Sequence, residues 1–121
     1  MAVAKVGFIV IDTVDPEALA PFWCELLGEK VDARIDDGRF VVLSSSSDGG
    51  PLVGFQRVPE AKVGKNRMHL DLVVEDLDAA TTRIEGLGGR WLEPGITREV
   101  EGYRWRCMAD PEGNELDIAL E

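Results

Sequence analysis

The chain has 121 residues, of which 45% are hydrophobic and 30% are charged, the balance of one soluble globular domain or of two small fused modules. Acidic residues outnumber basic ones 23 to 13, so the net charge is -10, which argues against nucleic acid and anionic membrane surfaces as partners. No signal peptide or membrane-spanning segment is apparent, and two cysteines are too few for a disulfide framework. We therefore expect a cytoplasmic protein with free thiols.

The most informative feature of the sequence is that its second half repeats the first. Phe8–Ile11 aligns with His69–Leu72 at an offset of 61 residues, and the same offset places Asp15 on Asp76. Each half therefore predicts a strand, an acidic helix start, a helix and several short strands. The segment Pro59–Asn66 is expected to link the halves because it contains proline, glycine and lysine. The two predicted modules are residues 1–60 and residues 61–121.

In the first module, a strand over Phe8–Ile11 leads into a helix. Asp15 can cap this helix, Pro16 suits its first position because no N–H is needed there, and Gly28 supplies a left-handed stop. Pro21 lies inside the helix and is expected to kink it. Helical spacing predicts a buried face made of Leu19, Phe22, Trp23, Leu26 and Leu27. Three strands follow, over residues 30–35, 39–44 and 52–58, with a hairpin turn at Asp37-Gly38 between the first two.

The second module follows the same plan, with a first strand that begins at His69. Its helix is predicted to start at Asp76, to stop at Gly88 and to bury Leu77, Ala80, Ile84 and Leu87. Short strands are predicted near residues 90–92, 96–100, 103–109 and 114–120. The segment Asp110–Asn114 is typical of a type I turn closed by a glycine bulge, so we expect it to join the last two strands.

Three segments carry a resemblance to a known family: Phe22-Trp23 with Leu26-Leu27-Gly28, Arg67–Asp71, and Ala109–Leu116. With the repeated βαβββ order, they make the chain similar to the vicinal oxygen chelate superfamily of glyoxalases, bleomycin-resistance proteins and extradiol dioxygenases. The resemblance implies an α+β fold in which two paired βαβββ modules form a curved eight-stranded cup around a small-molecule site. It also implies a homodimer, which would cover the exposed sheet edges.

Strand alternation predicts which side chains face the cup. In the last strand, Leu116, Ile118 and Leu120 are expected to meet the helices, so Glu115, Asp117 and Ala119 point the other way. Pairing of Asp110 with Asn114 would place Cys107 opposite Asp117 and Trp105 opposite Ala119. The predicted ligand-binding residues are Phe8, Gly54, Gln56, His69, Asp71, Tyr103, Trp105, Cys107 and Glu115.

The resemblance also indicates where a metal would bind, because metal-using members carry one ligand on the first and last strand of each module. The aligned positions are Phe8, Gly54, His69 and Asp117. His69 and Asp117 can bind a divalent ion, whereas a phenyl ring and a glycine cannot. Two ligands are fewer than the three of a tight catalytic site, so no tightly bound metal is expected. The alternative is Mg²⁺, Mn²⁺ or Zn²⁺ with Asp71 or Glu115 as a further ligand.

Each polar candidate also has a plainer interpretation. His69 is the only histidine and is interpreted as a pocket residue bonded to a carboxylate, with metal ligand and general base as the alternatives. Asp71, Glu115 and Asp117 either form salt bridges with arginines or make a carboxylate cluster that raises one pKa. Cys107 is expected to be an inert thiol, because its predicted neighbour is negative.

Two classes of function follow from these residues. The first is a metal-independent binder of a small organic molecule, similar to the bleomycin-resistance branch, with aromatic walls and acidic residues that attract a cationic or hydrogen-bond-donating ligand. The second is a divalent-metal-dependent lyase, isomerase or hydrolase of the glyoxalase type that uses His69 and Asp117, with Glu115 or Asp71 moving protons. The presence of two ligands out of four favours the first class. A dimerisation module without a ligand is a third alternative.

Overall fold

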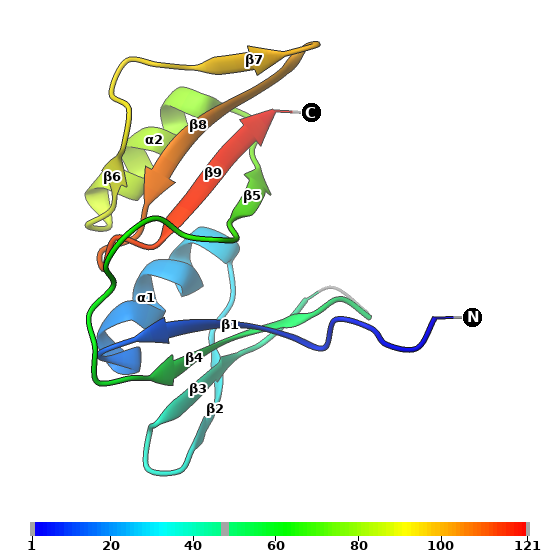
Figure 1. The fold of residues 1–121 in the computed structure, drawn as a ribbon, viewed down its shortest axis with the longest axis vertical. Helices are drawn as coiled ribbons and strands as arrows, with labels where there is room; N and C mark the ends of the chain where they lie inside the picture. The colour runs from blue at the N-terminus through cyan, green and yellow to red at the C-terminus, as the bar shows by residue number, and fades with distance from the viewer. Residues whose placement is uncertain (1, 47–48, 121) are drawn as a thin grey trace. The chain divides into compact units, whose positions relative to one another are not determined.

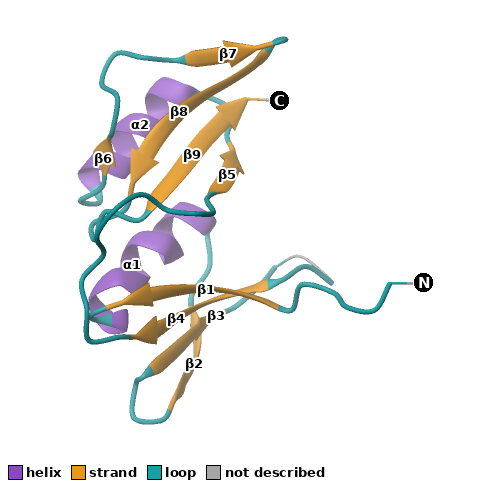
Figure 2. Ribbon diagram, viewed as in Figure 1, coloured by secondary structure: helices purple, strands orange, loops and turns teal. Residues whose placement is uncertain are grey.

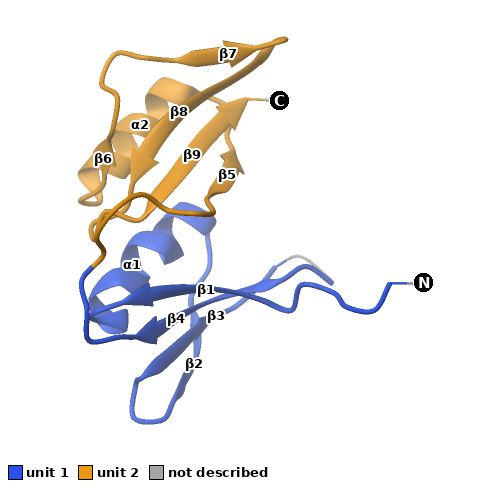
Figure 3. Ribbon diagram, viewed as in Figure 1, with its two compact units in different colours: residues 1–61 blue, residues 62–121 orange. Residues whose placement is uncertain are grey.

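The computed structural model describes residues 2–46 and 49–120, and the chain divides into two compact units, Met1–Ala61 and Lys62–Glu121 (Figure 1, Figure 3). Each unit has the order strand, helix and then strands, so the predicted α+β fold of two βαβββ modules is confirmed. The described residues form nine strands, which correspond to the nine segments predicted one by one, whereas the cup implied by the resemblance has eight strands. Neither described helix is long and apolar enough to span a membrane.

The first unit is a four-stranded sheet with a helix on one face (Figure 2). Its elements are β1 (Phe8–Thr13), α1 (Pro16–Leu27), β2 (Val31–Ile35), β3 (Phe40–Leu43) and β4 (Leu52–Arg57). The sheet order is β1-β4-β3-β2, with β1 parallel to β4 and the other pairs antiparallel. The core of this unit lies between α1 and the sheet, where the buried side chains are Leu19, Phe22, Trp23, Val41, Leu43 and Phe55.

The local signals predicted for the first unit are present in the structure. The Asp15 side chain accepts a hydrogen bond from the Ala18 N–H at 3.2 Å. Pro16 is the first helical residue, and Gly28 ends α1 with a φ of 68°. The helix continues through Pro21, which is exposed. At the hairpin turn, Asp37-Gly38 has φ values of 55° and 78°, the positive values that a type I′ turn needs.

The second unit is a five-stranded sheet with its own helix. Its elements are β5 (Leu70–Val73), α2 (Leu77–Gly86), β6 (Arg90–Trp91), β7 (Arg98–Val100), β8 (Tyr103–Ala109) and β9 (Glu115–Leu120). The sheet order is β5-β9-β8-β6, with β5 parallel to β9, and β7 pairs with another part of β8. Asp76 caps α2 through a bond of 3.0 Å to the N–H three residues later, as predicted.

The layer between α2 and its sheet contains polar groups that the apolar pattern did not predict. Thr81 is buried, where Ala80 and Leu87 had been expected to fill the helix face and are only half-buried. The Thr81 hydroxyl accepts from the buried Arg106 guanidinium at 2.8 Å, and the guanidinium carbon lies 4.3 Å from the centre of the Trp91 ring. Arg106 can be buried because its guanidinium also donates to Asp78 at 2.8 Å and to Thr97 at 3.0 Å, whereas the buried Trp91 Nε1 has no hydrogen-bond partner among the described residues.

The turn between β8 and β9 fixes the register of the hairpin. The buried Asp110 carboxylate accepts the N–H groups of Glu112 and Asn114 at 2.9 Å each, and it accepts the Asn114 side-chain amide at 2.8 Å. Gly113 has a φ of 86°, as a glycine bulge requires. The ladder then pairs Cys107 with Asp117 and Trp105 with Ala119, which confirms the predicted register.

Replacement of Asp110 by alanine should lower the free energy of unfolding by about 2–3 kcal/mol, because two partly buried backbone N–H groups and the Asn114 amide lose their acceptor. Asn114→Ala removes only the side-chain amide and should cost about 1 kcal/mol. Urea unfolding followed by circular dichroism measures both values. Equal losses in the two variants would mean that the carboxylate does not organise the turn.

Candidate functional site

In each unit the helix covers one face of the sheet, and the other face, which we call the open face, carries no helix of that unit. The open face of the second sheet bears the alternate residues of three neighbouring strands. The fully buried Leu116 and Ile118 lie on the helix side of β9, so the predicted alternation is confirmed. The residues on the open face include His69, Asp71 and Val73 at β5, Asp117 and Ala119 on β9, and Tyr103, Trp105 and Cys107 on β8.

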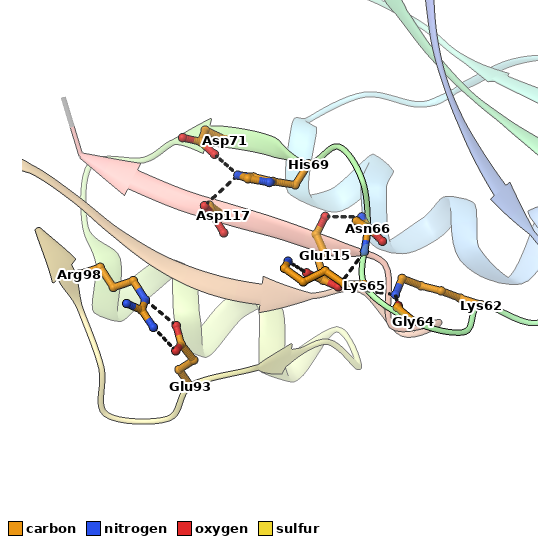
Figure 4. A network of polar contacts seen from close by, with 10 residues as sticks. All are labelled: Lys62, Gly64, Lys65, Asn66, His69, Asp71, Glu93, Arg98, Glu115 and Asp117. Carbon is orange, nitrogen blue, oxygen red and sulfur yellow. Dashed lines mark hydrogen bonds and ion pairs between the residues drawn. The ribbon is translucent and has the colours of Figure 1, made fainter. Parts of the chain in front are cut away.

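The centre of this face is a histidine between two aspartates (Figure 4). Asp71 and Asp117 are direct partners in the parallel β5–β9 ladder, and His69 immediately precedes β5. The His69 Nε2 atom lies 3.2 Å from Asp71 Oδ1 and 3.2 Å from Asp117 Oδ2. The Tyr103 hydroxyl donates to the other Asp71 oxygen at 2.9 Å. We call His69, Asp71, Tyr103 and Asp117 the His69 cluster.

The two carboxylates of the cluster lie in different environments. The Asp117 side chain is 12% exposed, whereas the His69 side chain is 47% exposed. Burial raises the pKa of Asp117, the nearby Asp71 charge raises it further, and His69 opposes both effects. The expected arginine salt bridges to these two aspartates are absent among the described residues: Asp71 contacts His69 and Tyr103, and Asp117 contacts His69. The cluster therefore has carboxylate acceptors that favour a bound proton or cation.

Glu115 does not join the His69 cluster. Its carboxylate contacts Lys65 and Lys62, the second at 3.6 Å, and accepts the N–H of Asn66 at 3.1 Å. The Lys65 ammonium is the main reason that the pKa of Glu115 is lowered, and the Asn66 N–H and Lys62 act in the same direction. The predicted group of three carboxylates is thus divided, and Asp71, not Glu115, is the third potential ligand beside His69 and Asp117.

Cys107 lies next to a pair of residues that sequence reasoning missed. Arg98 donates from Nε to Glu93 at 2.8 Å, and this partner holds the pKa of Glu93 at about 2. No periodic pattern marks these residues, because Glu93 lies in the segment between β6 and β7. Burial, Glu93 and Asp117 together raise the pKa of the Cys107 thiol to about 11. The thiol is therefore protonated at neutral pH, as expected of an inert side chain.

Aromatic side chains lie beside the polar cluster. The rings of Tyr103 and Trp105 have centroids 5.9 Å apart and are tilted by 37°. Trp105 is half-buried, and Tyr103 is exposed while its hydroxyl binds Asp71. One face of β8 thus offers apolar ring surface next to hydrogen-bonding groups, the combination found in sites for small organic molecules.

The open face of the first sheet is apolar at the corresponding positions. Phe8 and Val10 are 54% and 51% exposed, and Val10 pairs with Gly54 as Asp71 pairs with Asp117. A Cβ atom on Gly54 would lie 3.2 Å from the Val41 carbonyl oxygen, so the position is closely approached by backbone. Gln56 is half-buried on the same face, opposite Asp12 on β1 and Phe40 on β3.

The donor atoms of the second unit suit a divalent cation. His69, Asp71 and Asp117 each offer one ligand atom, and these atoms lie within 4.8 Å of one another. One imidazole nitrogen and two carboxylates are ligands that Mg²⁺, Mn²⁺ or Zn²⁺ accepts. The aligned first-unit positions, Phe8 and Gly54, supply no donor side chain. The donor set therefore fits a divalent metal, with all of its ligands from the second unit.

The Cys107 thiol should react slowly with iodoacetamide at pH 8.5 in a Cys24→Ser background. Because its pKa moves from 9.0 to about 11, the thiolate fraction, and with it the rate, should be about a hundredfold below that of the urea-unfolded chain. The unfolded chain releases this proton first, so the contribution of the thiol to stability is lost as the pH rises from about 9 to about 11. Equal rates for folded and unfolded protein would contradict the assignment.

Comparison with known proteins places this geometry in a family. The pattern of the glyoxalase-like domain matches residues 8–119. A glyoxalase/bleomycin resistance protein/dioxygenase family enzyme from Burkholderia phytofirmans PsJN has a similar structure, with a TM-score of 0.77 and 19% identity over 97% of this chain and 98% of that one. For a glyoxalase-related enzyme from Fulvimarina pelagi the TM-score is 0.73 and the identity 22%, over 97% of this chain and 88% of that one.

TioX from Micromonospora sp. ML1 is a further structural relative, with a TM-score of 0.63 and 17% identity over 97% of this chain and 98% of that one. No curated protein shows significant similarity to the chain. At these identities the solved structures establish the fold, and the domain pattern, which spans nearly the whole chain, establishes membership. The chain belongs to the glyoxalase-like domain family, within the superfamily that its repeat and motifs predicted.

Proposed function

We propose that this protein binds a small organic molecule on the open face of its second sheet, as a glyoxalase/bleomycin-resistance-like protein without a tightly held catalytic metal. The observation that supports this proposal is the Tyr103–Trp105 ring pair beside the His69 cluster. The rings would bind a flat apolar body, and the carboxylates of Asp71 and Asp117 would accept hydrogen bonds from it.

The charge of the protein favours a particular class of ligand. The net charge of -10 attracts cations over a distance, and the partly exposed Asp71 carboxylate attracts them locally. A ligand with an aromatic or aliphatic body and one ammonium or similar donor group would satisfy both parts of the face. The apolar residues of the first open face, with Phe8 on its edge strand and Gln56 as its polar group, are proposed as a further ligand-contacting surface of the first unit.

The same proposal includes the organisation of the protein. We propose that the modules 1–60 and 61–121 act together as one domain in a cytoplasmic homodimer. In the described sheets, β1 and β5 are edge strands that each pair on one side only, with β4 and β9 respectively. Such edges leave backbone groups available for association.

A matched pair of probes tests the predicted ligand class. 2-Naphthylmethylamine carries a cation, whereas 2-naphthalenemethanol has the same ring system without charge. The amine should bind more tightly, and Trp105→Ala should weaken binding of both probes by about tenfold because each loses ring contact. Isothermal titration calorimetry measures the four affinities.

Asp71→Asn separates the charge from the ring contact in this experiment. The variant should remove most of the preference for the amine and leave the affinity for the alcohol nearly unchanged. Phe22 and Trp23 are buried in the first unit and do not offer their rings to a probe. The effect of Trp105→Ala therefore reports on the open face of the second sheet. Equal affinities of the two probes for the unaltered protein would exclude cation recognition, and unchanged binding by Trp105→Ala would exclude this face.

The donor set of the second unit also supports a second candidate function. As a divalent-metal-dependent lyase, isomerase or hydrolase, the protein would hold its ion through His69, Asp71 and Asp117. A bound divalent ion supplies Lewis-acid polarisation of a ligand oxygen. Around that ion, the Tyr103 hydroxyl would keep Asp71 oriented, and Trp105 would position the apolar part of the substrate.

Elemental analysis after exhaustive dialysis decides between the two candidates. The structure brings three donors together in the second unit, the number that a catalytic zinc site has, so the ligand count alone does not decide the question. We expect less than stoichiometric metal, because Asp71 already accepts the Tyr103 hydroxyl and the aligned positions Phe8 and Gly54 of the first unit add no donor side chain. His69→Ala and Asp117→Ala are the controls. Near-stoichiometric metal in the unaltered protein that disappears from both variants would overturn the metal-independent proposal and favour the metalloenzyme.

A further inference from the structure

The His69 imidazole is not held by the sheet ladder. The β5 strand is a short edge strand that pairs with β9 alone, and its first paired residue is Leu70, opposite Leu116. His69 precedes that pair, so the contacts that hold the chain before β5 must keep the imidazole in place. About half of the His69 side chain is exposed, so packing alone does not fix its position.

Glu115 makes the contacts that the ladder lacks (Figure 4). It directly precedes Leu116, and both its side chain and its backbone bind the chain that leads to His69. Its carboxylate accepts the Asn66 N–H at 3.1 Å, and its carbonyl oxygen accepts the Asn66 side-chain amide at 3.2 Å. The same carboxylate forms ion pairs with Lys62 and Lys65.

We infer that Glu115 is the positioning residue of the His69 cluster: it holds the segment Lys62–Asn66 against the start of β9 and thereby keeps the imidazole between Asp71 and Asp117. His69 follows Asn66 by three positions along the chain, a reach of at most about 11 Å, so an anchor at Asn66 limits where the imidazole can lie. The Glu115 side chain is only 16% exposed, which is unusual for a glutamate without such partners.

This role differs from the direct ligand contact predicted from the sequence. Glu115 lies on the same face of β9 as Asp117, two residues away, so a bound molecule could in principle reach it. Its oxygens are already used, however, by one backbone N–H and two ammonium groups. The inference concerns the same face as the proposed function, but its test needs no ligand, so failure of one is distinguishable from failure of the other.

The single histidine gives a direct measurement of the imidazole position. The Cε1–H and Cδ2–H signals in a carbon–proton NMR spectrum belong to His69 alone. In Glu115→Ala these signals should shift most of the way to the values of the unfolded chain, and their Overhauser contacts to the Asp117 side chain should be lost. Glu115→Gln retains an acceptor for the Asn66 N–H, so it should show a smaller shift.

Asn66→Ala tests the anchor without altering the Glu115 carboxylate. It removes the bond from the Asn66 amide to the Glu115 carbonyl oxygen and keeps the Asn66 N–H on the Glu115 carboxylate. It should shift the His69 signals in the same direction as Glu115→Ala but less far, and the double variant, which loses both bonds, should shift them at least as far as Glu115→Ala. Glu85→Ala, which removes an equal charge from an exposed position on α2, is the matched control and should leave the signals unchanged.

Circular dichroism confirms that each variant is folded before its spectrum is interpreted. If Glu115→Ala does not fold, Glu115→Gln and Asn66→Ala carry the test. Unchanged His69 signals in Glu115→Ala would overturn the inference. Signals that move as far in Glu115→Gln as in Glu115→Ala, and not at all in Asn66→Ala, would show that the carboxylate acts through its charge and not as an anchor, which would also overturn it.

Discussion

A slip of one residue between β8 and β9 would turn Asp117 onto the helix side of the second sheet, away from the face that bears Trp105 and Cys107. The Asp110 carboxylate opposes that slip, because it accepts hydrogen bonds from the backbone of the turn that sets the register. The parallel pairing of β5 with β9 then brings Asp71 opposite Asp117. The chemistry of the open face thus depends on a buried acidic side chain that does not itself reach that face.

The two units use one backbone plan for different surfaces. In both, the first strand is parallel to the last, and one ladder pair occupies the centre of the open face: Val10 with Gly54, and Asp71 with Asp117. His69 follows Phe8 by the same 61 residues that separate Asp71 from Val10. A change of three side chains therefore distinguishes an apolar surface from one with an imidazole and two carboxylates.

Sequence reasoning succeeded where the signal is local. The caps at Asp15 and Asp76, the stop at Gly28 and the turn at Asp110–Asn114 follow from the conformations that these residues favour. Strand alternation then assigned the open faces, because side chains on a strand alternate between the two faces. Together these signals predicted both modules and the residues of the His69 cluster.

The polar contacts that connect distant segments could not be predicted in this way. Glu115 and Asn66 are 49 residues apart, and Arg106 finds Thr81 across 25 residues. Charge and hydrogen-bonding capacity indicate that such groups need partners, but they do not indicate which partners the fold will supply. For this reason Glu115 was predicted to contact a ligand, whereas in the structure it binds Lys65 and Asn66. Likewise, Ala80 was predicted for the buried helix face, whereas Thr81 is the buried residue there.

The exposed apolar side chains of the first sheet also affect the colloidal behaviour of the protein. Phe8, Val10 and Ile35 lie on strands of one sheet and are each more than half exposed, so two molecules that met through this surface would exclude water from it. At neutral pH the net charge of -10 makes such encounters repulsive. Near the isoelectric point of about 4.5 that repulsion disappears, and mild acidification should promote self-association before it unfolds the chain.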